Sequence, residues 1–176
     1  VQEGNFDHSQ NPLFAVLNPR FAGGASIGAA YKADMAAVNE YLAQPAVREL
    51  FPADIMFKWG VKGDDKIDGR FYLYAIRIST PDGKAPLDGS VVTEAREQYA
   101  QRGANAVVSM SMNGEGTQEW ARLTGENIGK CIAIVLDGYV YSAPRVNSKI
   151  DKGQSQITGD FTIQEAKDLA NVLNSG

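Results

Sequence analysis

The spacing of large apolar residues predicts two amphipathic helices, one near each end of the chain. Residues 26–42 carry an apolar stripe at steps of three or four, with Ser26 as the predicted N-cap. That stripe consists of Tyr31, Met35, Val38 and Leu42. The last helix begins after Thr162, where Glu165 completes a capping box. Its predicted buried face consists of Ile163, Ala166, Leu169, Ala170 and Leu173.

Two further helices are predicted from their end signals. Pro45 is suited to the first position of a short helix, whose expected buried side is Val47, Leu50 and Phe51. Asn113 can cap a longer helix, and Gly129 fits its C-terminal stop. The apolar side of this longer helix holds Trp120, Leu123 and Ile128.

Alternating and continuous apolar runs predict strands between these helices. Residues 54–61 and 70–80 read as two strands joined by the charged segment 62–66, which we expect to be a solvated hairpin tip. Residues 90–101 predict a strand that runs into an irregular segment, and residues 107–112 predict another strand.

Asp137 and Gly138 mark a tight turn between the apolar strands 131–136 and 139–142. Asp-Gly favours a two-residue hairpin loop because both positions need a positive φ. A short strand is predicted at 155–158. Cys131, the only cysteine, lies in an apolar run, and we expect it to be a small buried hydrophobic residue rather than a reactive thiol.

These elements predict an α+β fold with a mostly antiparallel sheet and helices on one face. From residue 104 onward the order is strand, helix, strand, strand, strand, helix, which suggests a ferredoxin-like base region at 104–176. Residues 12–103 are expected to form a smaller α/β, head-like region. Residues 1–11 are polar without periodicity and are expected to be a loose terminus.

Composition narrows the classes of function. The net charge of −4 and the pI of about 5.0 leave no basic footprint, so no nucleic-acid partner is expected. No run approaches the roughly 20 apolar residues that span a bilayer, so any membrane attachment would come from segments outside this sequence.

The chain offers little catalytic chemistry. His8 is the only histidine and lies in the polar terminus, so neither a catalytic base nor a zinc site is expected. Asp64 and Asp65 fall on the predicted hairpin tip, where solvent surrounds carboxylates. The glycines at 114–116 lack the spacing of a phosphate-binding loop. The glycine-rich tract at 21–28 could bind an anion at a helix N-terminus, but without a preceding strand and an acidic partner we interpret it as a flexible connection. We therefore expect no catalytic residue, cofactor or metal; the residues alone indicate a binding or structural module.

Three segments in the second half resemble the SecD family of protein-export membrane proteins. They are residues 113–130 (NGEG, then LTGENIGK), residues 133–144 (AIVLDGYVYSAP) and residues 156–176 (QITGDFT, then EAKDLANVLNSG). Residues 86–89 and 107–109 fit the family more loosely, whereas residues 1–85 resemble the longer insertions of SecD–SecF fusions from Bacteroidetes-like bacteria.

The resemblance implies a domain on the periplasmic (extracytoplasmic) side of the inner membrane, cut from a longer protein. In SecD this domain has a base and a mobile head, and it grips unfolded preprotein emerging from SecYEG, driven by the proton gradient. The implied partners are unfolded preprotein, SecYEG and SecF. The proton-carrying groups lie in the membrane segments, so the resemblance implies no enzymatic role for this chain.

Within this framework, the expected polypeptide-binding residues are the aromatic residues of two adjacent strands, Phe57, Trp59, Phe71, Tyr72 and Tyr74. A sheet of this kind can offer an apolar surface or an edge for strand addition. The competing interpretation is that the same aromatic residues pack under the helix at 31–42. The alternative function is a non-catalytic structural or small-ligand-binding module of an envelope protein.

Overall fold

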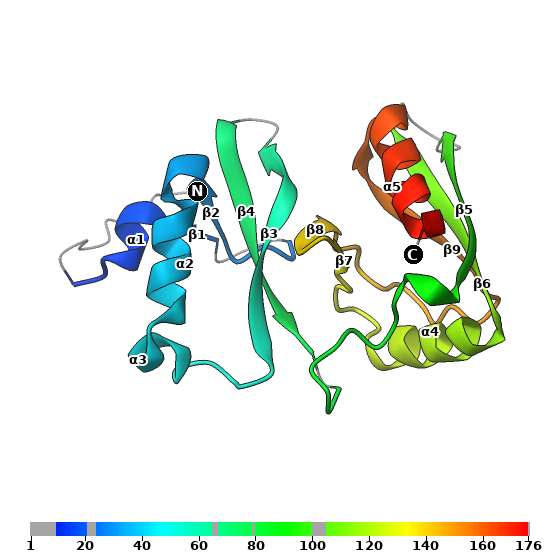
Figure 1. The fold of residues 1–176 in the computed structure, drawn as a ribbon, viewed down its shortest axis with the longest axis horizontal. Helices are drawn as coiled ribbons and strands as arrows, with labels where there is room; N and C mark the ends of the chain where they lie inside the picture. Colours follow the sequence, from blue (N-terminus) through cyan, green and yellow to red (C-terminus); the bar gives the residue numbers. More distant parts are fainter. Residues whose placement is uncertain (1–9, 21–23, 65–66, 79, 100–104, 176) are drawn as a thin grey trace. The chain divides into compact units, whose positions relative to one another are not determined.

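The computed structural model describes residues 10–20, 24–64, 67–78, 80–99 and 105–175 (Figure 1). The chain forms two compact units. The first unit comprises residues 1–79 and 135–141, and the second comprises residues 80–134 and 142–176. The chain therefore passes from one unit to the other three times, at 79/80, 134/135 and 141/142.

The first unit is built on a six-stranded sheet in the order β1-β2-β4-β3-β8-β7. Its long central pair, β3 and β4, is antiparallel, and β3 pairs in parallel with β8 at a single position, Gly60 opposite Val140. In chain order the elements are α1 (Leu13–Val16), β1 (Asn18–Pro19), β2 (Gly28–Tyr31), a 3-10 turn (Lys32–Asp34), α2 (Met35–Ala43), α3 (Pro45–Arg48), β3 (Ile55–Asp64), β4 (Ile67–Arg77), β7 (Ile134–Leu136) and β8 (Tyr139–Ser142).

The core of the first unit lies between α2 and one face of this sheet. Leu73 of β4 and Val38 of α2 are fully buried. Leu17, Ala30, Leu42 and Trp59 complete the buried cluster. Burying one such leucine or valine side chain contributes roughly 1.5–3 kcal/mol, so this contact is what holds α2 against the sheet.

The predicted helix at 26–42 is wrong in its first half. Residues 28–31 form β2, which pairs antiparallel with residues 70–73 of β4, and α2 begins only at Met35. Ser26 therefore caps no helix. The periodicity of 35–42 was a correct helix signal, but pairing with β4 overrides it upstream. Gly28 permits the close approach, since a Cβ there would lie 3.0 Å from Leu17 Cδ1.

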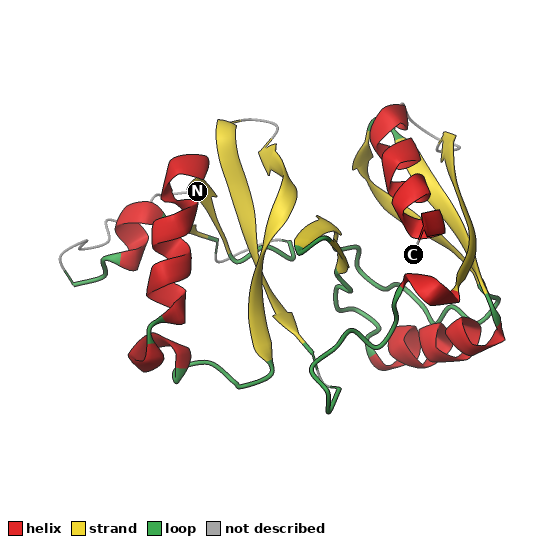
Figure 2. Ribbon diagram, viewed as in Figure 1, coloured by secondary structure: helices red, strands yellow, loops and turns green. Residues whose placement is uncertain are grey.

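The second unit has a three-stranded antiparallel sheet in the order β5-β6-β9. Helix α5 lies across one face of this sheet (Figure 2) and buries Ala166, Leu169, Ala170 and Leu173 there, as predicted, while Ile163 stays exposed. In chain order the elements are a 3-10 turn (Gly89–Val91), β5 (Val92–Tyr99), β6 (Ala106–Met112), α4 (Gly114–Glu126), β9 (Gln154–Phe161) and α5 (Ile163–Ser175).

Both long helices of the second unit start where the sequence predicted. The Asn113 side chain accepts a hydrogen bond from the Gly116 amide at 2.8 Å, which caps α4. At α5, the Thr162 amide donates to Glu165 Oε2 at 2.8 Å and the Glu165 amide donates to Thr162 Oγ1 at 3.2 Å. This reciprocal pair is the predicted capping box. Helix α4 ends at Glu126, so Ile128 lies beyond it and is exposed.

From residue 104 onward the observed order β6, α4, β7, β8, β9, α5 matches the prediction, and the α+β class is confirmed. The division of the chain differs from the expected boundary at 103/104. Residues 92–99 pair with residues 106–112 of β6, so β5 belongs with the second unit. The hairpin at 135–141 instead joins the sheet of the first unit.

Cys131 is exposed, which corrects the expectation that it is buried. The predicted strand 131–136 is regular only over Ile134–Leu136. Cys131 itself makes one isolated bridge, with Arg145. A single bridge does not place Cys131 inside a sheet, so the apolar residues next to it in the sequence did not predict its burial.

Candidate functional site

The five aromatic residues expected to bind polypeptide divide between the two faces of the β3–β4 pair. Phe57 lies opposite Ala75 and Trp59 opposite Leu73, so these side chains share the face that packs on α2. Trp59 is 7% exposed and its indole N–H donates to Asn39 Oδ1 at 2.9 Å. Phe57 and Phe71 pack against the same buried cluster.

Three of the five residues therefore serve the core of the first unit. The competing interpretation, packing under the helix, holds for Phe57, Trp59 and Phe71. Period-two alternation and the pairing of β3 with β4 place them on the same face as Leu73, which is fully buried. Of these three side chains Trp59 is buried, whereas Phe57 and Phe71 are half-buried at the edge of the cluster.

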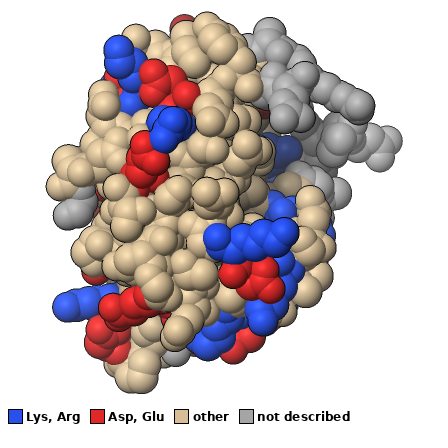
Figure 3. Space-filling model, turned by 90° about the vertical axis from the view of Figure 1, so that its right-hand side faces the viewer, with Lys and Arg blue, Asp and Glu red and all other residues tan. Residues whose placement is uncertain are grey.

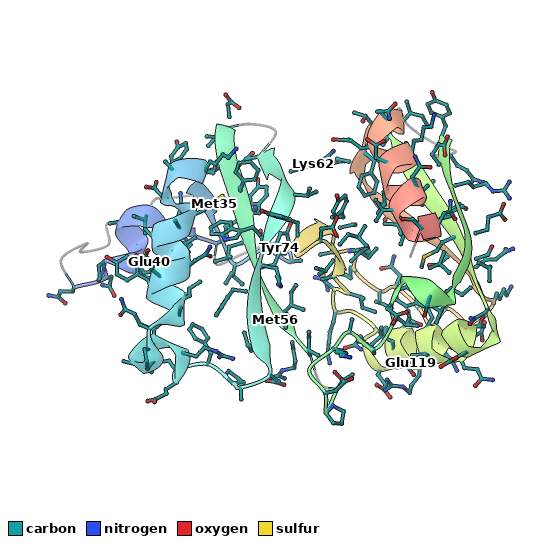
Figure 4. All side chains as sticks on the ribbon, in the orientation of Figure 1. Met35, Glu40, Met56, Lys62, Tyr74 and Glu119 are labelled. Atoms are coloured by element: carbon teal, nitrogen blue, oxygen red, sulfur yellow. The ribbon has the colours of Figure 1, made fainter. Side chains whose placement is uncertain are left out.

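Tyr72 and Tyr74 project from the opposite face of β4. Tyr74 lies across from Lys58, and Ile76 lies across from Met56. We call this surface the tyrosine face; it consists of Met56, Lys58, Tyr72, Tyr74 and Ile76, all of them half-buried. Figure 4 labels Met56 and Tyr74 on the two strands.

A glycine makes room for the ring of Tyr74. A Cβ at Gly60 would lie 3.4 Å from Tyr74 Cε2, so the ring rests against the bare backbone of β3. Gly60 is also the residue that pairs with Val140 of β8. The aromatic surface thus lies where the β7–β8 hairpin joins the sheet.

Tyr72 is held by charged neighbours. The Arg20 guanidinium carbon lies 5.0 Å from the centre of the Tyr72 ring, within the range of a cation–π contact. Burial raises the pKa of Tyr72, and a hydrogen bond to Asp64 raises it further. Burial likewise raises the pKa of Tyr74. Both phenols therefore stay protonated at neutral pH, and that of Tyr72 donates its hydrogen bond to Asp64.

Asp64 does not lie on a solvated hairpin tip, as the sequence suggested. Strand β3 continues to Asp64, whose side chain is 3% exposed and accepts from Arg70 Nε at 3.1 Å and Nη2 at 2.5 Å. The strand contains a bulge between Trp59 and Asp64, which turns this carboxylate inward. Asp65 and the adjacent Lys66 lie outside the described residues.

The Asp137–Gly138 turn has the backbone that the sequence predicted. Its φ angles are +49° and +83°, the left-handed values that a two-residue hairpin loop of this kind needs. A Cβ on Gly138 would meet no atom closer than 4.0 Å. The requirement for glycine there is conformational rather than steric.

The described residues contain no cluster of three or more His, Cys, Asp or Glu side chains that could hold a metal ion. His8 lies outside them. One groove in the second unit has a volume of about 550 Å³. It is lined mainly by polar residues of the 85–91 segment and of α4, among them Asp88, Glu115, Gln118, Glu119 and Arg122.

Charge does not single out a binding surface on the face that Figure 3 shows. Lys and Arg side chains there lie beside Asp and Glu side chains rather than in one patch. None of the described helices is long and apolar enough to cross a bilayer.

Sequence reasoning missed two side-chain interactions that organise these surfaces. One is the buried Asp64–Arg70 pair, for which the only available signal was the position of opposite charges on either side of a hairpin. The other is a pair of hydrogen bonds between Asn174 and the backbone of Ala95, which are 79 residues apart. Such a distant contact has no local sequence signature.

Comparison with known proteins assigns the family. The model of the SecDF P1 head subdomain matches residues 74–176. We expected the head at residues 12–103 and the base at residues 104–176. The matched head subdomain includes the whole region that we expected to be the base.

The chain is 41% identical over 174 residues to the protein translocase subunit SecD of Rhodothermus marinus, covering 97% of the chain and 27% of that protein. It is 43% identical over 88 residues to SecD of Desulfurispirillum indicum, covering 50% of the chain and 17% of that protein. The chain thus spans about a quarter or less of the length of these relatives.

Among solved structures, the crystal structure of SecDF in its super-membrane-facing form is similar over 85% of this chain and 21% of that one, with a TM-score of 0.50 and 26% identity. Because the family model covers more than half of the sequence, the chain belongs to the SecD/SecDF family of protein translocase subunits and contains its P1 head subdomain.

Proposed function

We propose that this domain binds extended, unfolded preprotein on the extracytoplasmic side of the membrane during export through SecYEG, in cooperation with SecF. The tyrosine face is the proposed contact surface in the first unit. The observation that supports this proposal is the division of the β4 aromatic residues between two faces: Phe71 packs against the buried cluster under α2, whereas Tyr72 and Tyr74 lie half-buried on the opposite face.

The chemistry of this face suits a partner of varied sequence. Two aromatic rings and the side chains of Met56 and Ile76 offer apolar area without a deep, selective pocket. The protonated phenol of Tyr74 offers a hydrogen-bond donor to a peptide backbone, while the phenol of Tyr72 already donates to Asp64. A translocase subunit must accept many preproteins, so tolerance of sequence is the property to expect.

The proposed role is binding without catalysis, and the driving proton gradient would act through membrane segments of the full-length protein. Binding by the isolated domain should be weak, with Kd on the order of 10 μM to 1 mM, because ordering a flexible chain opposes it. Weak binding also allows the preprotein to be released after each step.

An NMR titration with an unfolded preprotein segment tests the proposal. Shifts should concentrate at Met56, Lys58, Tyr72, Tyr74 and Ile76. The double variant Tyr72→Ala/Tyr74→Ala should lower the affinity at least fivefold, whereas Leu50→Ala, which removes an exposed apolar side chain of the same unit, should not change it. No chemical-shift change anywhere in the protein at millimolar peptide would refute polypeptide binding.

A further inference from the structure

Strand β5 forms one edge of the second unit's sheet, and a side chain already occupies part of that edge. The Ala95 amide donates to Asn174 Oδ1 at 2.7 Å, and Asn174 Nδ2 donates to the Ala95 carbonyl at 2.8 Å. Both backbone groups of Ala95 therefore point away from β6. Asn174 stands near the C-terminal end of α5, and it supplies both bonds with one carboxamide.

A carboxamide is chemically a peptide group, with one carbonyl acceptor and an N–H donor. At Ala95 it makes the two bonds that a neighbouring strand would make. The edge of β5 thus binds a peptide-like group within this molecule. This contact shows that the outward backbone groups of Ala95 can bond a peptide-like group that is not part of β6.

The same alternation fixes which other backbone groups point outward. The register from 94 to 99 runs without a shift against 111 to 106 of β6, so Glu97 and Tyr99 share the outward orientation of Ala95. Within the described residues, no hydrogen bond is found for the outward backbone groups of Glu97 and Tyr99. The Tyr99 side chain is 70% exposed.

The opposite edge of the sheet is less suited to an added strand. There, Ser142 Oγ donates to the Thr158 carbonyl at 2.8 Å. Strand β9 also has a register shift against β6 between Ala106 and Val108, which disturbs the regular spacing of outward groups. Strand β5 has its own register shift between Val92 and Glu94, but from Glu94 to Tyr99 it is the more regular edge of this sheet.

We propose that the β5 edge of the second unit accepts an extended segment of unfolded polypeptide as an added β-strand, paired with Glu97 and Tyr99. The inference rests on the proposed function and adds a second contact, made through backbone hydrogen bonds. These bonds carry no sequence preference, which suits a preprotein partner. Asn174 limits the length of the added strand because it occupies the next outward position, Ala95.

Two substitutions at one position separate the backbone of this edge from its side chains. Glu97→Pro deletes the outward N–H and leaves the hydrogen bonds between β5 and β6 intact. Natural edge strands tolerate proline at such outward positions. Glu97→Ala changes only the side chain. With an unfolded preprotein segment as the probe, Glu97→Pro should weaken binding at least fivefold, and Glu97→Ala should stay within twofold of the unsubstituted chain.

Asn174→Ala tests the limit on strand length. Removing the carboxamide frees the Ala95 groups for a third pairing position, so affinity should rise about two- to fivefold and amide exchange at Ala95 should slow only when peptide is present. Unchanged affinity in this variant would overturn the assignment of Asn174 as the limit.

A change in the peptide tests the edge without altering the protein. A segment N-methylated at alternate residues keeps its side chains but cannot complete a ladder, so it should bind at least fivefold more weakly, even if Glu97→Pro proves unfolded. If the unsubstituted chain binds peptide and neither N-methylation nor Glu97→Pro weakens binding, the edge proposal is wrong and the proposed function stands. If the unsubstituted chain binds no peptide, both fail.

Discussion

The two units of this domain place an arginine–carboxylate interaction in opposite surroundings. In the first unit, Arg70 pairs with Asp64, and the side chains are 21% and 3% exposed. In the second unit, Arg122 on α4 lies between Glu119 and Glu126, one turn away on either side, and all three side chains are reached by water. The chemistry is the same, and only the degree of burial differs.

The difference shows where an ion pair matters for stability. Exposed helical pairs contribute little, because water solvates each charge nearly as well as its partner does. A buried carboxylate depends on its partner, since removal of one charge leaves the other without water. Asp64 also lies at the bulge in β3, so its pairing with Arg70 fixes the local path of the strand that carries Trp59.

The strongest test of this comparison removes the buried charge. Asp64→Asn should lower the free energy of unfolding by about 3 kcal/mol, at the lower end for a broken buried pair because Arg70 keeps some contact with water. Urea unfolding followed by tryptophan fluorescence measures this directly, since Trp59 lies on the same strand.

Glu119→Gln is the matched control in the second unit. This variant removes one carboxylate partner of Arg122, while Glu126 remains. The free energy of unfolding should change by no more than the error of the measurement. Equal losses from the two variants would show that burial does not govern these pairs.

A glycine on α4 sharpens the comparison by testing a buried position in the second unit. A Cβ on Gly116 would lie 2.6 Å from Val91 Cβ, so Gly116→Ala should destabilise the domain by about 1–3 kcal/mol through overpacking. On the same helix a Cβ on Gly114 would meet nothing within 4 Å, and Gly114→Ala should stabilise by about 0.4–1 kcal/mol. Calorimetric melts of the pair should move in opposite directions.

The smallest effect is expected at alkaline pH, in the first unit. The pKa values of Tyr72 and Tyr74 are raised in the folded state, so the unfolded chain ionises first as pH passes 10. Their stabilising contribution is complete below pH 10 and is lost as pH rises through the folded pKa values. Urea midpoints between pH 8 and 11 should fall more for the parent chain than for Tyr74→Phe; parallel curves would contradict the assignment.

Local signals in the sequence predicted the second half of the fold well. The Asn113 cap, the box of Thr162 and Glu165 and the order of six elements each depend on residues close together in the chain. The first half was less predictable because its strands depend on distant pairing. Residues 28–31 look like the start of a helix in the sequence, but they form a strand because they pair with β4, about 40 positions later.

The sequence was sufficient to place the candidate site on the β3–β4 strand pair. It was not sufficient to say which face of that pair is open to a partner. Aromatic residues on β3 and β4 were evident, yet alternation alone does not say which row meets α2. That choice was decided by Leu73 and Val38, which are fully buried against each other's elements. The edge contact of Asn174 with Ala95 depends on tertiary packing of α5 on β5, and no spacing rule could have predicted it.

The three passages of the chain between its units have a consequence for the order of assembly. The first unit includes residues 135–141, which follow the whole of α4 in the sequence. A chain that emerges from its N-terminus onward can form the α2–β4 core early, but it completes the six-stranded sheet only after residue 141 is out. By then β5, β6 and α4 are already free to fold, while β9 and α5 are still to come. The two units therefore finish in an interleaved sequence, and neither can be cut out as one continuous segment.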